Sequence, residues 1–165
     1  MATPIYNETQ RFRQIWIWAI LLGVTALVMG SMVNKLLNDP QATLVELIFP
    51  VVLLLLINGL FFSMRLTTRI DASSLTFSYF PFLSQRKYDW TIIESMELIT
   101  YNGLVDYGGW GIKWNGECWS YTTGGKWGIL VRTSTKKFLL GTHHPEKVKE
   151  VISYFMEIKS SSNGN

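Results

Sequence analysis

The stretch LIFPVVLLLLINGLFFSM, from Leu47 to Met64, is 18 residues long and carries no charge. A helix rises about 1.5 Å per residue, so this stretch reaches roughly 27 Å, close to the hydrocarbon thickness of a bilayer. A second uncharged stretch, IWIWAILLGVTALVMGSMV, runs from Ile15 to Val33. Because a chain of 165 residues is too small to cover two such helices, they predict a transmembrane hairpin over residues 15–64, with helices at 15–33 and 47–64.

The composition agrees with a membrane segment. Charged residues make up only 16% of the chain, whereas an average soluble domain holds roughly 25%. The net charge of +3 is too small to predict a nucleic-acid-binding face. A cleaved signal peptide is the alternative for the first stretch, but its apolar run exceeds the usual length of about 7–15 residues and no convincing cleavage site follows.

Basic residues around the hairpin predict its orientation. Four arginines flank its two ends: Arg11, Arg13, Arg65 and Arg69. The connector between the helices has only Lys35 as a basic residue. Since basic residues favour the cytoplasmic side, both termini are predicted in the cytoplasm, with residues 1–14 as a cytoplasmic N-terminus and the connector outside.

From Thr67 the apolar runs become short and alternating, as in LTFSYFPF, which is typical of half-buried strands. About seven such strands are expected, followed by an amphipathic helix in PEKVKEVISYFMEI. A small sheet of this kind must hide its edges or close, and a terminal helix can plug one end of a barrel. The sequence thus predicts an α+β membrane protein whose residues 65–159 form a helix-capped antiparallel barrel, before a disordered tail at 160–165.

Four segments carry a resemblance to a known family: TTRIDASSLTFSYFPF, the DW after the third predicted strand, FLLGTHHPEKV and YNGLVDYGGWGIKW. With two preceding transmembrane helices, they resemble small bacterial membrane proteins with a pleckstrin-homology-like (PH-like) domain. The last segment is similar to a Y-N-P-L-x-D-Y-G-G-W-G-I-R pattern of that group, with Gly103 in place of Pro and Lys113 in place of Arg. The resemblance implies a PH-like barrel at a bacterial inner membrane and implies little about a ligand.

The stretch from Tyr101 to Ile129 is rich in glycine and tryptophan. Glycines in NGLVDYGG, NGE and TGGK are typical of tight turns, which places most of the aromatic residues on strands. The segment 101–114 remains a candidate contact loop, because loops that join strands often carry binding residues. Its candidate residues are Tyr101, Asp106, Tyr107, Gly109, Trp110 and Lys113.

The sequence predicts no catalytic residue, cofactor or metal site. His143 and His144 are adjacent and precede a predicted helix, and the carboxylates cannot be paired from the sequence. Cys118 follows Glu117, which would not favour a thiolate. The other basic residues, among them Arg86, Lys87, Lys136 and Lys137, are read as a scattered solvated surface.

These observations predict a non-enzymatic binding or scaffolding module at the cytoplasmic face of a bacterial membrane. Its expected partners are membrane lipids around the helices, and a protein partner or a second copy of the chain, but not nucleic acid. One alternative is a structural subunit assembled through the hairpin, where Asn58 and Gly59 allow close approach of helices. The other alternative is an enzyme, which requires a pocket with paired acid and base groups.

Overall fold

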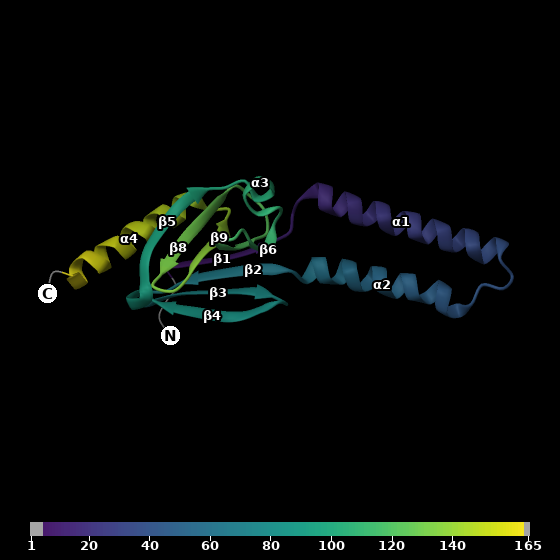
Figure 1. The fold of residues 1–165 in the computed structure, drawn as a ribbon, viewed down its shortest axis with the longest axis horizontal. Coiled ribbons are helices and arrows are strands. Elements are labelled where there is room, and N and C mark those ends of the chain that lie inside the picture. The colour runs from purple at the N-terminus through teal and green to yellow at the C-terminus, as the bar shows by residue number, and fades with distance from the viewer. Residues whose placement is uncertain (1–4, 164–165) are drawn as a thin grey trace. The chain divides into compact units, whose positions relative to one another are not determined.

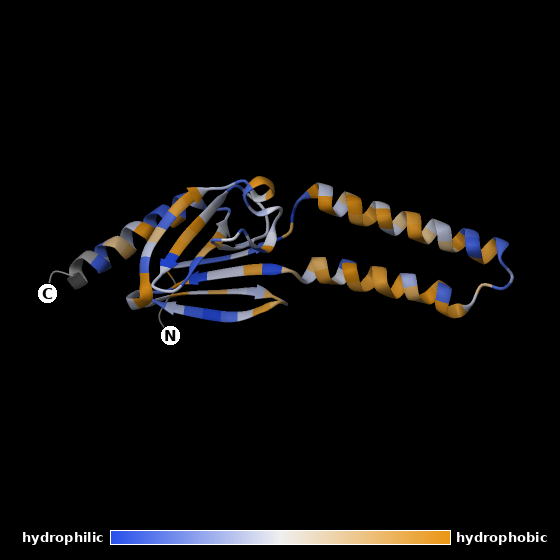
Figure 2. Cartoon of the chain, viewed as in Figure 1, coloured by the Kyte–Doolittle hydropathy of each residue, from blue (hydrophilic) through white to orange (hydrophobic). Residues whose placement is uncertain are grey.

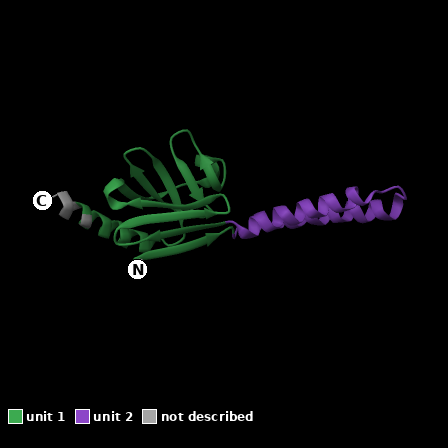
Figure 3. Ribbon diagram, turned by 90° about the horizontal axis from the view of Figure 1, so that it is seen from below, with its two compact units in different colours: residues 1–12, 65–165 green, residues 13–64 purple. Residues whose placement is uncertain are grey.

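The computed structural model describes residues 5–163, apart from the side chains of 158 and 160–163. The chain divides into two compact units (Figure 3). Unit 1 contains residues 1–12 together with 65–165, and unit 2 contains residues 13–64. The chain therefore leaves unit 1 after its first strand and returns to it after the helices.

Unit 2 is a pair of helices, α1 from Ile15 to Asn38 and α2 from Leu44 to Ser63. Both are long and apolar enough to cross a membrane, and Figure 2 shows apolar residues along most of their length. The Thr43 hydroxyl accepts a hydrogen bond from Glu46 N–H, and the Glu46 carboxylate accepts from Thr43 N–H, which caps the start of α2.

The two helices are linked by a polar contact through Asn58. The amide of Asn58 donates to Leu54 O at 2.8 Å and to the hydroxyl of Thr25, on α1, at 3.4 Å. The sequence predicted that Gly59 would also allow close approach of the helices. The structure does not show this, because a Cβ built at this position would meet no atom within 4 Å. Close packing of this hairpin therefore does not depend on Gly59.

The first strand, β1 from Tyr6 to Arg11, lies in the segment predicted to be an N-terminus outside the domain. It pairs in antiparallel fashion with β2 from Arg65 to Ile70, with Tyr6 opposite Ile70 and Arg11 opposite Arg65. The helical pair is thus inserted between two neighbouring strands. Hydrophobic patterning misses β1 because two of its three buried side chains, Glu8 and Gln10, are polar.

Nine strands of the described residues form two sheets, where the sequence predicted one closed barrel of about seven strands. The first sheet has the order β1-β2-β3-β4 and the second has the order β5-β8-β9-β7-β6 (Figure 1). All pairs are antiparallel except β7 with β9, which is parallel. The remaining strands are β3 (Ser74–Phe80), β4 (Leu83–Asp89), β5 (Ile93–Thr100), β6 (Gly111–Trp114), β7 (Trp119–Thr122), β8 (Trp127–Thr133) and β9 (Lys137–Thr142).

The main core lies between the inner faces of the two sheets. The ring of Phe77 on β3 packs against Tyr121 and Phe138 of the second sheet, with centroids 4.9 and 5.2 Å apart. The C-terminal helix α4, from Pro145 to Asn163, contacts β5, β1 and β8 (Figure 1). It buries Val148, Val151 and Phe155, and it includes the first four residues, 160–163, of the predicted tail.

Helix α4 is also joined to the turn between the two sheets. This turn is the short 3-10 helix η1, from Trp90 to Ile92. The Trp90 ring lies 5.2 Å from the ring of Phe155, and its indole N–H donates to Ala72 O at 2.8 Å.

Polar side chains of β1 attach the first sheet to the second. The Glu8 carboxylate is buried and accepts hydrogen bonds from the Tyr6 hydroxyl, from Thr142 Oγ1 at 2.9 Å and from His143 N–H at 2.9 Å. The Gln10 amide donates to Gly141 O at 2.6 Å. These side-chain hydrogen bonds join β1 to the end of β9, although the two strands lie in different sheets and do not pair through their backbones.

Candidate functional site

The outer face of the second sheet carries the glycine- and tryptophan-rich segment. The short helix α3, from Gly103 to Tyr107, lies in this segment (Figure 1). Tyr101, Cys118, Leu130 and Leu139 form a buried cluster, with Ile99 and Tyr107 packed against it. Because neighbouring residues of a strand point to opposite faces, this cluster is separate from the core around Phe138. The segment therefore covers a face of the sheet that would otherwise expose apolar residues.

Tyr101 and Tyr107 have packing roles in this cover. Tyr101 is only 6% exposed, and its hydroxyl donates to Gly124 O at 2.9 Å. The half-buried Tyr107 ring meets the Tyr101 ring edge-on, with centroids 6.2 Å apart. Burial raises the pKa of Tyr101 to about 12, and it also raises the pKa of Cys118 beneath it.

Asp106 and Gly109 stabilise the backbone conformation at the two ends of α3. The exposed Asp106 carboxylate accepts from Asn102 N–H at 2.7 Å, while Asn102 Oδ1 accepts from Leu104 N–H at 3.1 Å and caps the helix. Gly108 has φ 67° and Gly109 has φ 135°, values that favour glycine, where the chain turns toward β6.

Trp110 is half-buried and lies against the first residue of α3. A Cβ at Gly103 would be 2.6 Å from Trp110 Nε1, so only glycine allows this approach. The Lys113 side chain lies near Gly109, with Cε 3.7 Å from a Cβ built there. The six candidate residues are therefore gathered around α3 and β6, but none of them lines the cleft of the domain.

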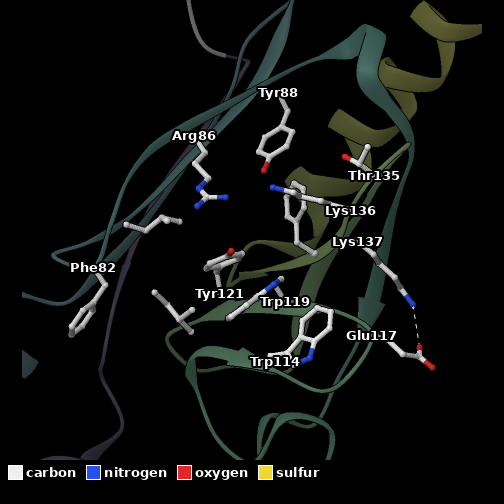
Figure 4. Close-up of a pocket in the computed structure, with 13 residues that line it drawn as sticks. Phe82, Arg86, Tyr88, Trp114, Glu117, Trp119, Tyr121, Thr135, Lys136 and Lys137 are labelled. Carbon is white, nitrogen blue, oxygen red and sulfur yellow. Dashed lines mark ion pairs between the residues drawn. The ribbon is translucent and has the colours of Figure 1, made fainter.

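That cleft lies between β4 and the β6-β7-β9 part of the second sheet (Figure 4). Strands β4 and β6 are edge strands of their sheets, so the cleft lies where the two sheets are not joined by a strand pair. Its volume is about 540 Å³. The lining residues are Phe82, Leu83, Arg86, Tyr88, Ile112, Trp114, Glu117, Trp119, Tyr121, Thr135, Lys136, Lys137 and Phe138.

Aromatic rings form the floor and one wall of the cleft. Tyr88 packs on Phe138 with a centroid distance of 4.9 Å, and Tyr121 is buried beside them. Trp114 and Trp119 are paired across β6 and β7, with ring centroids 5.3 Å apart. They keep 51% and 44% of their surface exposed, so their rings are available at the mouth.

Three basic residues line the cleft, and of these Arg86 and Lys136 point into it while Lys137 points toward Glu117 (Figure 4). Lys137 lies 3.9 Å from the carboxylate of Glu117, which is the one acidic residue of the lining. Within the described residues, Arg86 and Lys136 form no ion pair. Burial raises the pKa of Tyr121, and the nearby Arg86 guanidinium opposes this shift. The cleft therefore has a positive charge that no acidic group of residues 5–163 neutralises by an ion pair.

No local sequence pattern indicates this site. The sequence predicts that Arg86 and Lys136 belong to a scattered solvated surface, because 50 positions separate them in the chain. The two residues come to one cleft because Tyr88 on β4 packs against Phe138 on β9, with ring centroids 4.9 Å apart. Among the described residues, no group of three or more His, Cys, Asp or Glu could hold a metal ion. Comparisons of the chain with protein-family models, curated proteins and solved structures find no match.

Proposed function

We propose that this protein is a membrane-anchored binding module that takes an anionic, partly aromatic or apolar ligand in the cleft between β4 and β6-β7-β9. The observation that carries the proposal is the pairing of two unneutralised cations with exposed tryptophans in one concave site. A guanidinium group binds carboxylates and phosphates through charge-assisted hydrogen bonds, and aromatic rings favour flat or apolar groups. The ligand's anion would lie near Arg86 and Lys136, and its apolar part on Trp119.

The proposed location is the cytoplasmic face of a bacterial inner membrane, with α1 and α2 crossing the bilayer. The basic residues at the two ends of the hairpin support this orientation. The one basic residue near the connector, Lys35, is paired with Glu46 at 2.7 Å, which leaves little free positive charge there. A membrane tether raises the effective concentration of the module near a membrane-bound partner, so a weak contact suffices.

We infer that unit 1 is a PH-like domain with one seam open. Support comes from its two sheets and from a C-terminal helix that packs beside them. The β6-β7 hairpin extends the second sheet, and its two tryptophans line the open seam. A binding role fits the site better than catalysis, because the only carboxylate of the lining is Glu117, whose side chain is 83% exposed.

Binding of 2-naphthyl phosphate to the full-length protein in nanodiscs tests the proposal. Isothermal titration would compare it with inorganic phosphate and with 2-naphthol, using empty nanodiscs as the baseline. The aromatic phosphate should bind more tightly than either part alone. A charge-assisted hydrogen bond contributes about 1.5–3 kcal/mol, so Arg86→Gln should weaken binding by about tenfold or more.

Lys87→Gln is the matched control, because Lys87 is the next residue of β4, does not line the cleft and is paired with Asp89 at 3.2 Å. It should leave binding unchanged, whereas Trp119→Ala should weaken it. Equal losses in Arg86→Gln and Lys87→Gln would show that only overall charge matters. Equal binding by the wild type and Arg86→Gln would remove the cleft as the site.

A further inference from the structure

A second surface of unit 1 carries exposed aromatic rings at the end of the first sheet. The turn Phe80-Pro81-Phe82 joins β3 to β4, and its two phenylalanines are 47% and 57% exposed. Large apolar side chains at the tip of a turn are costly in water unless another surface covers them. The surrounding chain indicates which surface that is.

Strand register places this turn beside the connections to the helices. Arg65 pairs with Arg11 on one side and with Phe80 on the other. Arg65 directly follows Met64, the residue that caps the end of α2. Phe80 is therefore paired with the residue at which the chain enters unit 1 from α2.

The charges at this end suit an anionic surface. The basic residues are Arg11, Arg13 and Arg65, and within the described residues none of them forms an ion pair. The Arg65 guanidinium lies over the Phe80 ring, 5.1 Å from its centroid. Aromatic rings with arginines beside them are favoured where a bilayer meets water, because the rings leave water while the cations contact headgroups.

We propose that Phe80 and Phe82 insert into the interfacial layer of an anionic bilayer, with Arg11, Arg13 and Arg65 at its headgroups. This contact rests on the proposed spanning of the membrane by α1 and α2, and it fixes how unit 1 faces the bilayer. Phe82 also lines the cleft, so the contact holds one rim of the cleft at the lipid surface.

Spin labelling of the full-length protein in vesicles of phosphatidylcholine and phosphatidylglycerol tests the contact. A nitroxide would be attached at Phe82→Cys, at Ser134→Cys in the exposed β8–β9 turn, and at Leu54→Cys in α2. The native Cys118 is buried and should not react under these conditions. Collisions with oxygen and with a water-soluble nickel complex then report the depth of each label.

The label at 82 should collide with the nickel complex several-fold less often than the label at 134. In vesicles of phosphatidylcholine alone, the label at 82 should collide with the nickel complex more often than in the mixed vesicles. The substitution Arg65→Gln should have the same effect. A label at 82 as exposed as that at 134, with position 54 protected by lipid, would overturn the contact alone. Nickel access at position 54 would instead refute the membrane-spanning helices themselves.

Discussion

The strand β1 is held to the second sheet mainly by Glu8, and the substitution Glu8→Ala tests this attachment. The carboxylate is 6% exposed and receives three hydrogen bonds, from Tyr6, Thr142 and His143. When it is removed, the Tyr6 and Thr142 hydroxyls still bond to each other at 3.0 Å, and the His143 N–H loses its acceptor. A lost partner for one buried donor costs about 1–3 kcal/mol, and the vacated space adds to this.

The expected loss of unfolding free energy for Glu8→Ala is therefore about 2–3 kcal/mol, or roughly 10 °C in Tm for a unit of this size. Glu8→Gln keeps the shape and an acceptor for His143, so it should cost only about 1 kcal/mol. Near-UV circular dichroism of the full-length protein in detergent follows the melting of unit 1 through its aromatic residues.

Glu97→Ala is the matched control, because Glu97 is an exposed carboxylate on a strand, and its removal should change the free energy of unfolding by no more than about 0.5 kcal/mol. If Glu8→Ala and Glu97→Ala have the same melting temperature, the hydrogen bonds of Glu8 do not hold β1 to the second sheet.

Three other predictions concern different parts of unit 1. Replacing residues 13–63 by Asn-Gly should give a soluble, folded unit 1 with the near-UV spectrum of the full chain, because the β1–β2 register ends with Arg11 opposite Arg65, so a short turn after this pair can connect the two strands; an unfolded product would contradict that register. Gly103→Ala should lower the stability of unit 1 by about 1–3 kcal/mol, since its Cβ would meet the Trp110 ring, while Leu104→Ala, at a 58% exposed position, should have little effect. The urea midpoint should be steady up to about pH 10 and fall between about pH 10 and 12, because burial raises the pKa of Tyr101 to about 12 and the unfolded chain releases this proton first; an unchanged midpoint across that interval would show that Tyr101 ionises freely.

The helices could be predicted because their signal is local and continuous. Two long runs without charge give both elements of unit 2, and the structure extends α1 from Val33 to Asn38 across Lys35. Turn chemistry also carries over, since Gly116 in NGE and Gly125 in TGGK have φ values of 97° and 79°. In each case a few adjacent residues determine the backbone.

Strand β1 and the cleft could not be predicted, because their signals are not local. The inward face of β1 carries Glu8 and Gln10, whose partners Thr142 and Gly141 lie more than 130 positions away. Without those partners the polar residues look like a solvated N-terminus. The cleft depends in the same way on the position of β7 beside β9, which hydrophobic alternation alone does not reveal.

The insertion of the helical pair between β1 and β2 sets an order on biosynthesis. Strand β1 leaves the ribosome first, but its six-residue ladder to β2 has to wait until both helices have been made. If the two helices span the bilayer, as proposed, a chain in which only one helix crossed would leave β1 and β2 on opposite sides of the membrane. The first sheet could then not be completed, and such chains would remain unfolded and open to proteolysis.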